Sequence, residues 1–305
     1  MKSTAYLAAA VGLLIGGLSP CVLGAPSVEP TLIPQAGALN TPASATLRLK
    51  FKVGETQVYH LVMHINGTIA QNGAAAMPFD QVIDMTSTQV VQSIDPTSAA
   101  ATVKSNLVMS SMTMTYNGKV IPIPTTAKSP IGDITSVIEP TGKVDSFHMD
   151  PVPGTPQALK MDTNNPMFGA IFSPDKPVSV GDTWSRSTTG GIMGMNVTTN
   201  YKLSDLSVSK GEQMATVDST LSGNLSSTVP NHAATTMNGT FSGTQSTLFD
   251  NTAGVTDSVT SNSHVIVVTA TDTSQPPPPG AAGTTPTDQK IDITQVMTMT
   301  LVSVK

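Results

Sequence analysis

Cysteine is almost absent from this chain, because Cys21 is the only one in 305 residues. It lies close to the N-terminus, so the rest of the chain has no disulfide bonds to stabilise it and depends on burial and backbone pairing. The same scarcity excludes structural zinc sites and redox pairs that need several cysteines.

Charged and aromatic residues are also scarce, at 11% and 4% of the chain. The formal net charge is −5 at pH 7, with only 15 basic residues, which argues against nucleic acid or an anionic membrane surface as a partner. Outside the N-terminus, no apolar run is long enough for a membrane-spanning helix. Serine, threonine, glycine and alanine make up much of the rest, as is common in exported β proteins.

Residues 1–24 predict a secretory signal peptide. Lys2 precedes an apolar run from Ala5 to Leu18, which is too short for a stable membrane span and is followed closely by Pro20. The small residues before Ala25 fit a cleavage site after Gly24. We therefore expect an exported protein of the periplasm or cell envelope of a bacterium, or a secreted one.

A second processing route remains open at Cys21. Leu18-Ser-Pro-Cys21 resembles a bacterial lipobox, in which the cysteine is lipidated and becomes the new N-terminus. The departure is Pro20, where that pattern has Gly or Ala. A membrane attachment is expected only through a lipid on Cys21, and cleavage after Gly24 removes that residue.

Beyond the signal, the sequence predicts a mainly β fold. Residues 25–44 are rich in Pro and Ala without periodicity and indicate a disordered leader. Two stretches, 45–150 and 178–305, then alternate apolar and polar residues with the period of half-buried strands. Between them, residues 151–177 form a connector whose prolines break any strand, and Thr155-Pro156 marks the start of a short helix.

The two β stretches are similar to each other. Three pairs of segments occur in the same order: 53–56 with 180–183, 101–107 with 215–221, and 139–142 with 250–254. In the first pair, Gly54 and Gly181 supply the positive φ that a strand-opening turn needs. We predict an internal duplication, in which two similar antiparallel halves form one curved sheet or tandem half-barrels.

Local signals refine this prediction. The alternation of apolar residues over 46–53 predicts the first strand of the fold. A change of phase at Ser110-Ser111 predicts a β-bulge, and Asn117-Gly118 predicts a type I′ hairpin turn. Asn66-Gly67 is a further hairpin signal if the strand ends there. His60 and His64 fall on the polar face of one strand, about 13 Å apart, which is too far for one metal ion.

The chain resembles a family of exported bacterial proteins of unknown function, DUF6263. The resemblance lies in Leu-x-Leu-Lys-Phe-Lys-Val-Gly-Glu-Thr ending at Thr56, in Pro174 to Trp184, and in Phe-Asp-x-x-x-Gly ending at Gly254. These are turn and strand-opening motifs, so the resemblance implies a fold and supplies no catalytic residue. By analogy, such sheets resemble the strongly curved open barrels of periplasmic lipoprotein carriers and lipid-binding lipoproteins.

No motif indicates catalysis, a metal site or a cofactor, since the sequence has neither a Gly-x-Ser-x-Gly elbow nor a phosphate loop. Methionine is the unusual residue, at 16 of 305, and several lie two apart on one strand face. Three explanations remain open for them: core packing, an adaptable apolar pocket, or Cu(I) binding by thioethers.

We therefore predict an exported, non-enzymatic binding protein for a lipid or another apolar ligand on the concave face of a curved sheet. The predicted ligand-binding residues are Phe168, Ile171, Phe172, Trp184, Met193 and Met195. The alternative is an envelope structural or adhesion module without a ligand, and methionine-based copper binding is the third hypothesis.

Overall fold

The computed structural model describes residues 43–71, 74–121, 133–150, 173–188, 195–209, 211–229, 232–271 and 288–305. Every regular element in these ranges is a β-strand, and the 12 strands form a single antiparallel sheet. The predicted β class is therefore confirmed, and one continuous sheet replaces the tandem half-barrels. Within the same ranges, no helix has the length and hydropathy of a membrane span.

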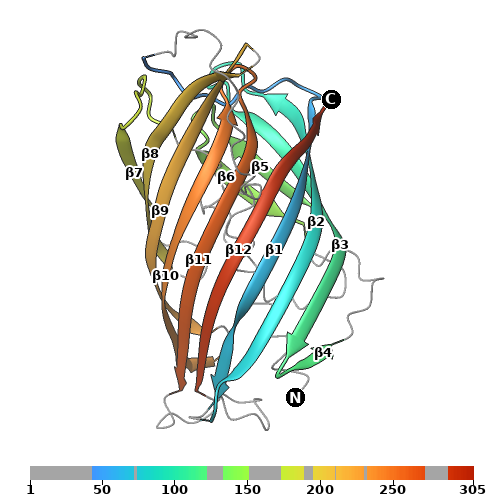
Figure 1. Ribbon diagram of the computed structural model, residues 1–305, viewed down its shortest axis with the longest axis vertical. Coiled ribbons are helices and arrows are strands. Elements are labelled where there is room, and N and C mark those ends of the chain that lie inside the picture. The colour runs from blue at the N-terminus through green and yellow to red at the C-terminus, as the bar shows by residue number, and fades with distance from the viewer. Residues whose placement is uncertain are drawn as a thin grey trace, which may run out of the picture.

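Most strands lie next to strands that are close to them in the sequence, and the first strand also pairs with the last (Figure 1). Their bounds are β1 (Thr56–Gln71), β2 (Met77–Ile94), β3 (Ala101–Tyr116), β4 (Lys119–Ile121), β5 (Ile134–Ile138), β6 (Val144–Met149), β7 (Thr183–Thr188), β8 (Met195–Ser209), β9 (Glu212–Val229), β10 (His232–Asp250), β11 (Val255–Thr271) and β12 (Gln289–Val304). The order in space is β6-β5-β3-β2-β1-β12-β11-β10-β9-β8-β7, with β4 paired to β3. The first and last strands thus meet in the middle, and each half of the chain forms one flank.

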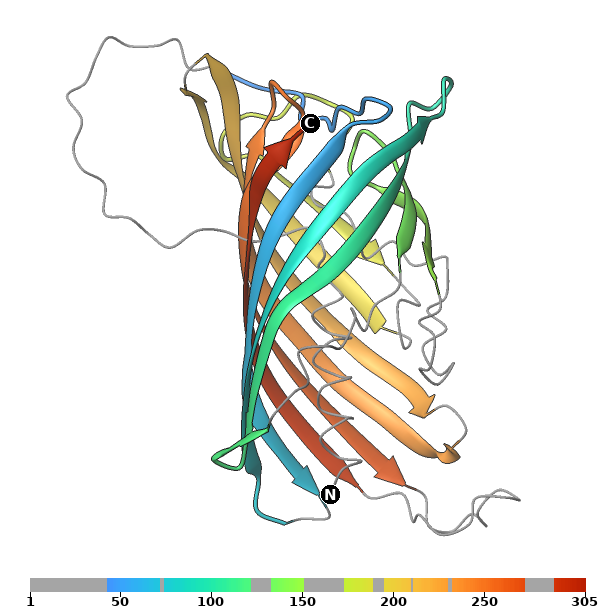
Figure 2. The same ribbon diagram turned by 90° about the vertical axis from the view of Figure 1, so that its right-hand side faces the viewer.

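The sheet is a trough rather than a flat layer. Figure 2 shows that its two flanks curve toward the same side, so that they enclose a concave face, here called the inner face. Tight approach of strands accompanies the curvature. A Cβ added to Gly67 would lie 2.1 Å from the backbone oxygen of Asp292 on β12, so only glycine fits there.

The hairpin signal at Asn66-Gly67 was therefore misleading. Both residues lie inside β1, which continues to Gln71 and pairs along its length with β12. Gly67 allows the two central strands to approach closely, because a side chain at this position would collide with the backbone of β12.

The alternation along β1 separates the buried residues of the inner face from the exposed residues of the outer face. Tyr59, Leu61 and Met63 are buried on the inner face, whereas His60 and His64 are exposed on the outer face. This period of two is the one predicted from the sequence.

The two strand-opening turns have the same geometry. Gly54 has φ +83° and Gly181 has φ +97°. Gly54 N–H donates to Val91 O at 2.9 Å, and Gly181 N–H donates to Leu203 O at 2.7 Å. The return bonds, from Val91 N to Glu55 O and from Leu203 N to Asp182 O, are both 3.0 Å. The predicted similarity of these two turns is confirmed.

The irregularities of the sheet are also repeated. The register between β2 and β3 shifts between Val91 and Ser93, and the register between β8 and β9 shifts between Leu203 and Asp205. A further shift, between Asp84 and Met85, leaves Ser110 without a partner residue. It is the bulge predicted at Ser110-Ser111.

The predicted type I′ turn between β3 and β4 is also present. Asn117 and Gly118 both have positive φ, at 47° and 72°. These two residues reverse the chain directly after β3.

One end of the trough is closed by the segment 45–50, which crosses between the flanks; we call it the capped end. Ala45 forms an isolated bridge with Val178. Leu49 N–H donates to Pro140 O at 2.8 Å, and Lys50 N–H donates to Gly254 O at 3.0 Å. The strand predicted over 46–53 is therefore wrong, because this segment pairs with turns of both flanks instead of a neighbouring strand.

Of the predicted connector, only residues 173–177 belong to the described part of the chain. Its helical portion at 155–172 lies outside the described residues, as do residues 1–42 with the predicted signal peptide and leader. Ser173 marks the return of the described chain, and its N–H donates to Thr141 O at 2.8 Å.

Candidate ligand-binding face

Cross-strand pairing arranges the inner face in rows that run across the sheet. Each row contains one inward residue from each strand, and neighbouring rows lie two residues apart, about 6.7 Å. Five such rows, counted from the capped end, cover the long strands β3-β2-β1-β12-β11-β10-β9-β8. Their composition determines what the face can bind.

Three of these rows are almost entirely apolar. The first contains Met109, Met85, Leu61, Met299, Val259, Thr247, Val217 and Leu203. The fourth contains Tyr116, Phe79, Gly67, Ile293, Val265, Phe241, Gly223 and Val197. The fifth contains Met77, Ile69, Ile291, Val267, Gly239, Leu225 and Met195. Most of these side chains belong to, or pack against, one buried cluster with members from β6 to β8 across the sheet, whereas Val217 and Leu203 belong to a second cluster.

Polar residues gather in the second and third rows. Both rows begin with methionine on β3 and become polar across the sheet. The polar members are Gln81, Gln295, Ser263, Thr199 and Arg186 in the third row, and Ser261, Gln245 and Ser219 in the second. We call these eight residues the polar belt. It crosses the trough between apolar rows on either side.

Three members of the polar belt are buried with an atom that has no hydrogen-bond partner. These atoms are Gln81 Oε1, Gln295 Oε1 and Ser219 Oγ. Gln81 is 0% exposed and Gln295 is 3% exposed. An unsatisfied buried polar atom costs about 1–3 kcal/mol, so each of them needs an explanation.

The amide nitrogen of Gln81 is only weakly engaged. Its Nε2 donates to the thioether sulfur of Met112 at 2.9 Å, and a thioether is a poor acceptor. The Gln81 side chain therefore has hydrogen-bonding capacity at both amide atoms.

An aromatic pair and a cation lie at the β7 edge of the inner face. Trp184 stacks on Tyr201, with ring centroids 5.6 Å apart and an interplanar angle of 10°. Burial raises the pKa of the Tyr201 phenol. Arg186 lies opposite Thr199, and burial lowers the pKa of its guanidinium. This edge combines an apolar surface with one positive charge.

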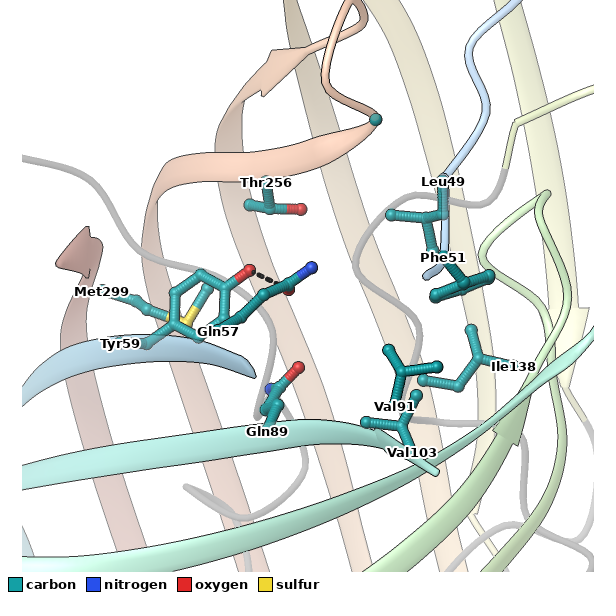
Figure 3. Close-up of a pocket in the computed structure, with 11 residues that line it drawn as sticks. Leu49, Phe51, Gln57, Tyr59, Gln89, Val91, Val103, Ile138, Thr256 and Met299 are labelled. Carbon is teal, nitrogen blue, oxygen red and sulfur yellow. Dashed lines mark hydrogen bonds between the residues drawn. The ribbon is translucent and has the colours of Figure 1, made fainter. Parts of the chain in front are cut away.

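A small cavity of about 40 Å³ lies at the capped end (Figure 3). Phe51, Val91 and Ile138 form the apolar side of this cavity, and its polar side includes Gln57. Tyr59 Oη donates to Gln57 Oε1 at 2.8 Å, as the dashed line shows. A space of this size holds a few water molecules and not a lipid.

The outer face is polar and carries histidine–aspartate pairs. The Nε2–Oδ distances are 3.1 Å for His60–Asp84, 2.7 Å for His64–Asp80 and 2.7 Å for His264–Asp292. These side chains are partly exposed, so we interpret them as cross-strand surface pairs. Over the described ranges, no three such ligand side chains are grouped for a metal ion.

A groove of about 840 Å³ also lies on the outer face, over β7 to β11. It is open, and most of its side chains are polar, including Asn200, Lys202 and Asp218. Asp218 accepts hydrogen bonds from Ser204 Oγ and Ser246 Oγ. Trp184 and Tyr201 also line the groove, and apolar atoms make up most of its exposed surface although most of its residues are polar.

The predicted ligand-binding residues are only partly placed. Phe168, Ile171, Phe172 and Met193 lie outside the described residues, and Met195 is placed by its backbone alone, in the fifth row. Trp184 stacks against Tyr201, and its predicted role in ligand binding stays a prediction.

The polar belt was not predicted from the sequence. Its signal was a polar residue at a strand position where the alternation of the neighbouring residues calls for an apolar one. Gln81 lies between Phe79 and Ile83, and Gln295 lies between Ile293 and Met297. In an alternating strand this phase places the side chain inside.

Comparison with protein families agrees with the resemblance over part of the chain. Residues 160–255 match the model of a family of unknown function, DUF6263. The match includes the motif that ends at Trp184 and the one that ends at Gly254, but not the one that ends at Thr56. No curated protein matches this sequence.

Solved structures give only distant similarities. A structure titled for lipid–protein interactions in lipovitellin has a TM-score of 0.39 at 9% identity; 84% of this chain is covered, and the chain spans 26% of that one. An outer membrane channel from Pseudomonas putida F1 has a TM-score of 0.25 at 6% identity, covering 83% and 97% of the two chains. OccK7 from Pseudomonas aeruginosa has 0.22 at 7%, covering 82% and 99%. With TM-scores below 0.5, none of these similarities indicates a function.

Proposed function

We propose that this protein is an exported, non-enzymatic binding protein that holds a lipid or another apolar ligand on its inner face. The observation that carries the proposal is the continuous apolar surface of the trough, interrupted only by the polar belt. Binding sites for such ligands are concave and mostly apolar, with a few polar groups that orient the ligand.

The sheet topology supports this proposal. The described sheet is open, because β6 and β7 are its two ends in the hydrogen-bonding order. In the described part of the chain, the backbone hydrogen bonds of segment 45–50 link the two flanks at the capped end. A ligand therefore enters the trough from the other end or between the flanks.

Methionine gives the inner face adaptability. Met63 faces Met297, and Met85 faces Met109, across neighbouring strands. Unbranched thioether side chains repack around ligands of different shape. The same facing pairs are the observation that favours Cu(I) binding as a second candidate function, because thioethers are soft ligands.

The test is a titration of the purified protein with 11-(dansylamino)undecanoic acid, a fluorescent fatty acid. We expect saturable binding. A blocking substitution, Ser261→Trp, fills the inner face at the centre of the trough, and it should weaken binding about tenfold or more, equivalent to about 1.4 kcal/mol.

The matched control is Thr260→Trp, which places the same side chain on the outer face one residue away. It should leave the affinity unchanged, with thermal unfolding showing that both variants fold. A loss in Thr260→Trp alone would move the site to the outer groove, which Thr260 lines. No saturable binding by the unmodified protein would favour the structural or adhesion module.

A parallel titration with Cu(I) separates the second candidate. Copper binding through methionine should fall when Met63 and Met297 are both replaced by leucine, which keeps the volume similar, whereas fatty acid binding should be retained in that variant. The reverse pattern, with fatty acid binding alone, leaves the apolar-ligand proposal in place.

A further inference from the structure

Two buried amide oxygens, those of Gln81 and Gln295, share one row of the trough, and the buried hydroxyl of Ser219 lies in the neighbouring row. Gln81 lies on β2, Gln295 on β12 and Ser219 on β9. Gln81 and Gln295 are in the same row and flank Ile65, so their backbones are two strand spacings apart, roughly 10 Å. The two amides therefore lie at one depth of the trough, within the two rows of the polar belt.

Unsatisfied buried amides destabilise the fold unless a ligand supplies the missing hydrogen bonds. A methionine or leucine at either position would continue the apolar character of the neighbouring strands, and it would remove the unpaired oxygen. Glutamine instead presents a donor and an acceptor, and its terminal amide can rotate to offer either one. A hydroxyl group is the simplest match, because it both donates and accepts.

The rows on each side of the belt define the rest of the ligand. The first row lies toward the capped end, and the fourth row lies toward the open end, each about 6.7 Å from the nearer row of the belt. Met85 and Leu61 belong to the first row, and Phe79 and Ile293 to the fourth. A ligand that spans these rows is hydrocarbon on both sides of its polar group.

We infer that the inner face selects an apolar ligand with a hydroxyl group in the middle of its hydrocarbon, bound by the amides of Gln81 and Gln295. This inference rests on the proposed function and specifies its ligand class. A mid-chain hydroxylated acyl chain has this chemistry, whether it is free or esterified in a larger lipid.

The experiment compares two matched probes, methyl stearate and methyl 12-hydroxystearate, as competitors of the dansylated fatty acid. The esters carry no carboxylate, so Arg186 does not distinguish them by charge. A net hydrogen bond between neutral groups contributes a factor of roughly five to ten, so the hydroxylated ester should bind five- to tenfold more tightly.

The double variant Gln81→Met, Gln295→Met should lose this preference while it binds methyl stearate as tightly as the unmodified protein does. Gln89→Met is the matched control, since Gln89 lies on β2 at the capped end, outside the polar belt. It should retain the full preference. Removal of two unpaired buried atoms should raise the melting temperature of the double variant, so loss of folding is not expected.

The outcomes separate the two proposals. Equal affinity for both esters, or a preference that survives in the double variant, overturns this inference and leaves the proposed function standing. If neither ester displaces the fluorescent probe and the probe itself does not bind, both are overturned. Repeating the comparison with the hydroxylated chain esterified in a phospholipid distinguishes a membrane lipid from a free acyl compound as its source.

Discussion

The two flanks have the same backbone at the capped end but fill it with different side chains. In the first half, Phe51 packs against Val91, Val103 and the partly buried Ile138. In the second half the corresponding residues all belong to one buried cluster. They are Val178, Leu203, Val217 and Phe249.

The differences compensate one another in volume. Phe51 corresponds to the smaller Val178, while Ile138 corresponds to the larger Phe249. Val91 likewise corresponds to the larger Leu203. Because the turns and bulges are repeated, each site has a similar space to fill, and close packing requires the total volume to be kept. The aromatic ring comes from the segment before the turn in one half, and from the end of a late strand in the other.

The largest effect should come from removing the ring that fills the second site. Phe249 is 1% exposed, and Phe249→Ala should lower the free energy of unfolding by about 3–5 kcal/mol through lost burial and a cavity. Ile138→Ala, at the corresponding position, should cost about 2 kcal/mol, because Ile138 is only partly buried. Denaturant unfolding measures both free-energy changes. Equal losses would contradict the conclusion that Phe249 fills more of its site than Ile138 fills of the corresponding one.

A smaller and symmetric effect is expected at the two turns. Gly54→Ala and Gly181→Ala each place a side chain at positive φ, with no heavy atom within 4 Å of the new Cβ. The loss should therefore be conformational alone, about 1 kcal/mol in each variant.

Each of these two glycine variants serves as the control for the other. Similar backbone geometry predicts that the two unfolding free energies fall by the same amount, within the error of denaturant titrations. A clear difference between them would show that the turns are less alike than their hydrogen bonds indicate.

The smallest effect concerns a charge that differs between the halves. Lys104 corresponds to Asp218 in the aligned segments. Lys104 forms an ion pair with Asp133 at 2.8 Å, whereas Asp218 accepts hydrogen bonds from two serine hydroxyls. Hydrogen bonds from Lys104 and Asn106 lower the pKa of Asp133. The ionised form is thus favoured by folding, so its stabilisation is present above the ordinary pKa and is lost as the pH falls through the lowered one.

Asp133→Asn should accordingly be slightly less stable than the unmodified protein at pH 7. The difference should shrink in acid as Asp133 becomes protonated. Urea unfolding at a series of pH values measures it, and a difference that stays constant or grows in acid would show that the carboxylate does not stabilise the fold by its charge.

The inner faces of the two flanks differ more than their capped ends. The first-half strands and β12 present large side chains such as Ile65, Phe79 and Met297, which are nearly inaccessible to solvent. The second-half strands present smaller or polar residues at the same level, including Gly243 and Gln245. The inner face of the trough therefore has an apolar wall on one side and a more polar wall on the other.

Much of the local structure could be predicted from short patterns. The alternation of β1, the bulge near Ser110 and the turn at Asn117-Gly118 depend on neighbouring residues, so the sequence was sufficient for them. The pairing of β1 with β12 joins residues more than 200 positions apart, and no local pattern contained that information. The predicted strand at 46–53 failed for the same reason, because its partners are distant turns.

The candidate site was less predictable than the fold. Trp184 was identified from its rarity, but its stacking partner Tyr201 was not. Gln81 and Gln295 were overlooked because each is an ordinary polar residue in its own strand. Their meaning appears only when pairing through Ile65 brings them into one row.

The order of polar and apolar residues by itself determined the strands, their faces and the repeated turns, since a side chain's face in a strand depends only on whether its position is odd or even. The tertiary structure decided which strands became neighbours, and therefore which inward residues share a level of the trough. That choice depends on long-range pairing and curvature, and it is the reason the unpaired amides lie together in an apolar surface.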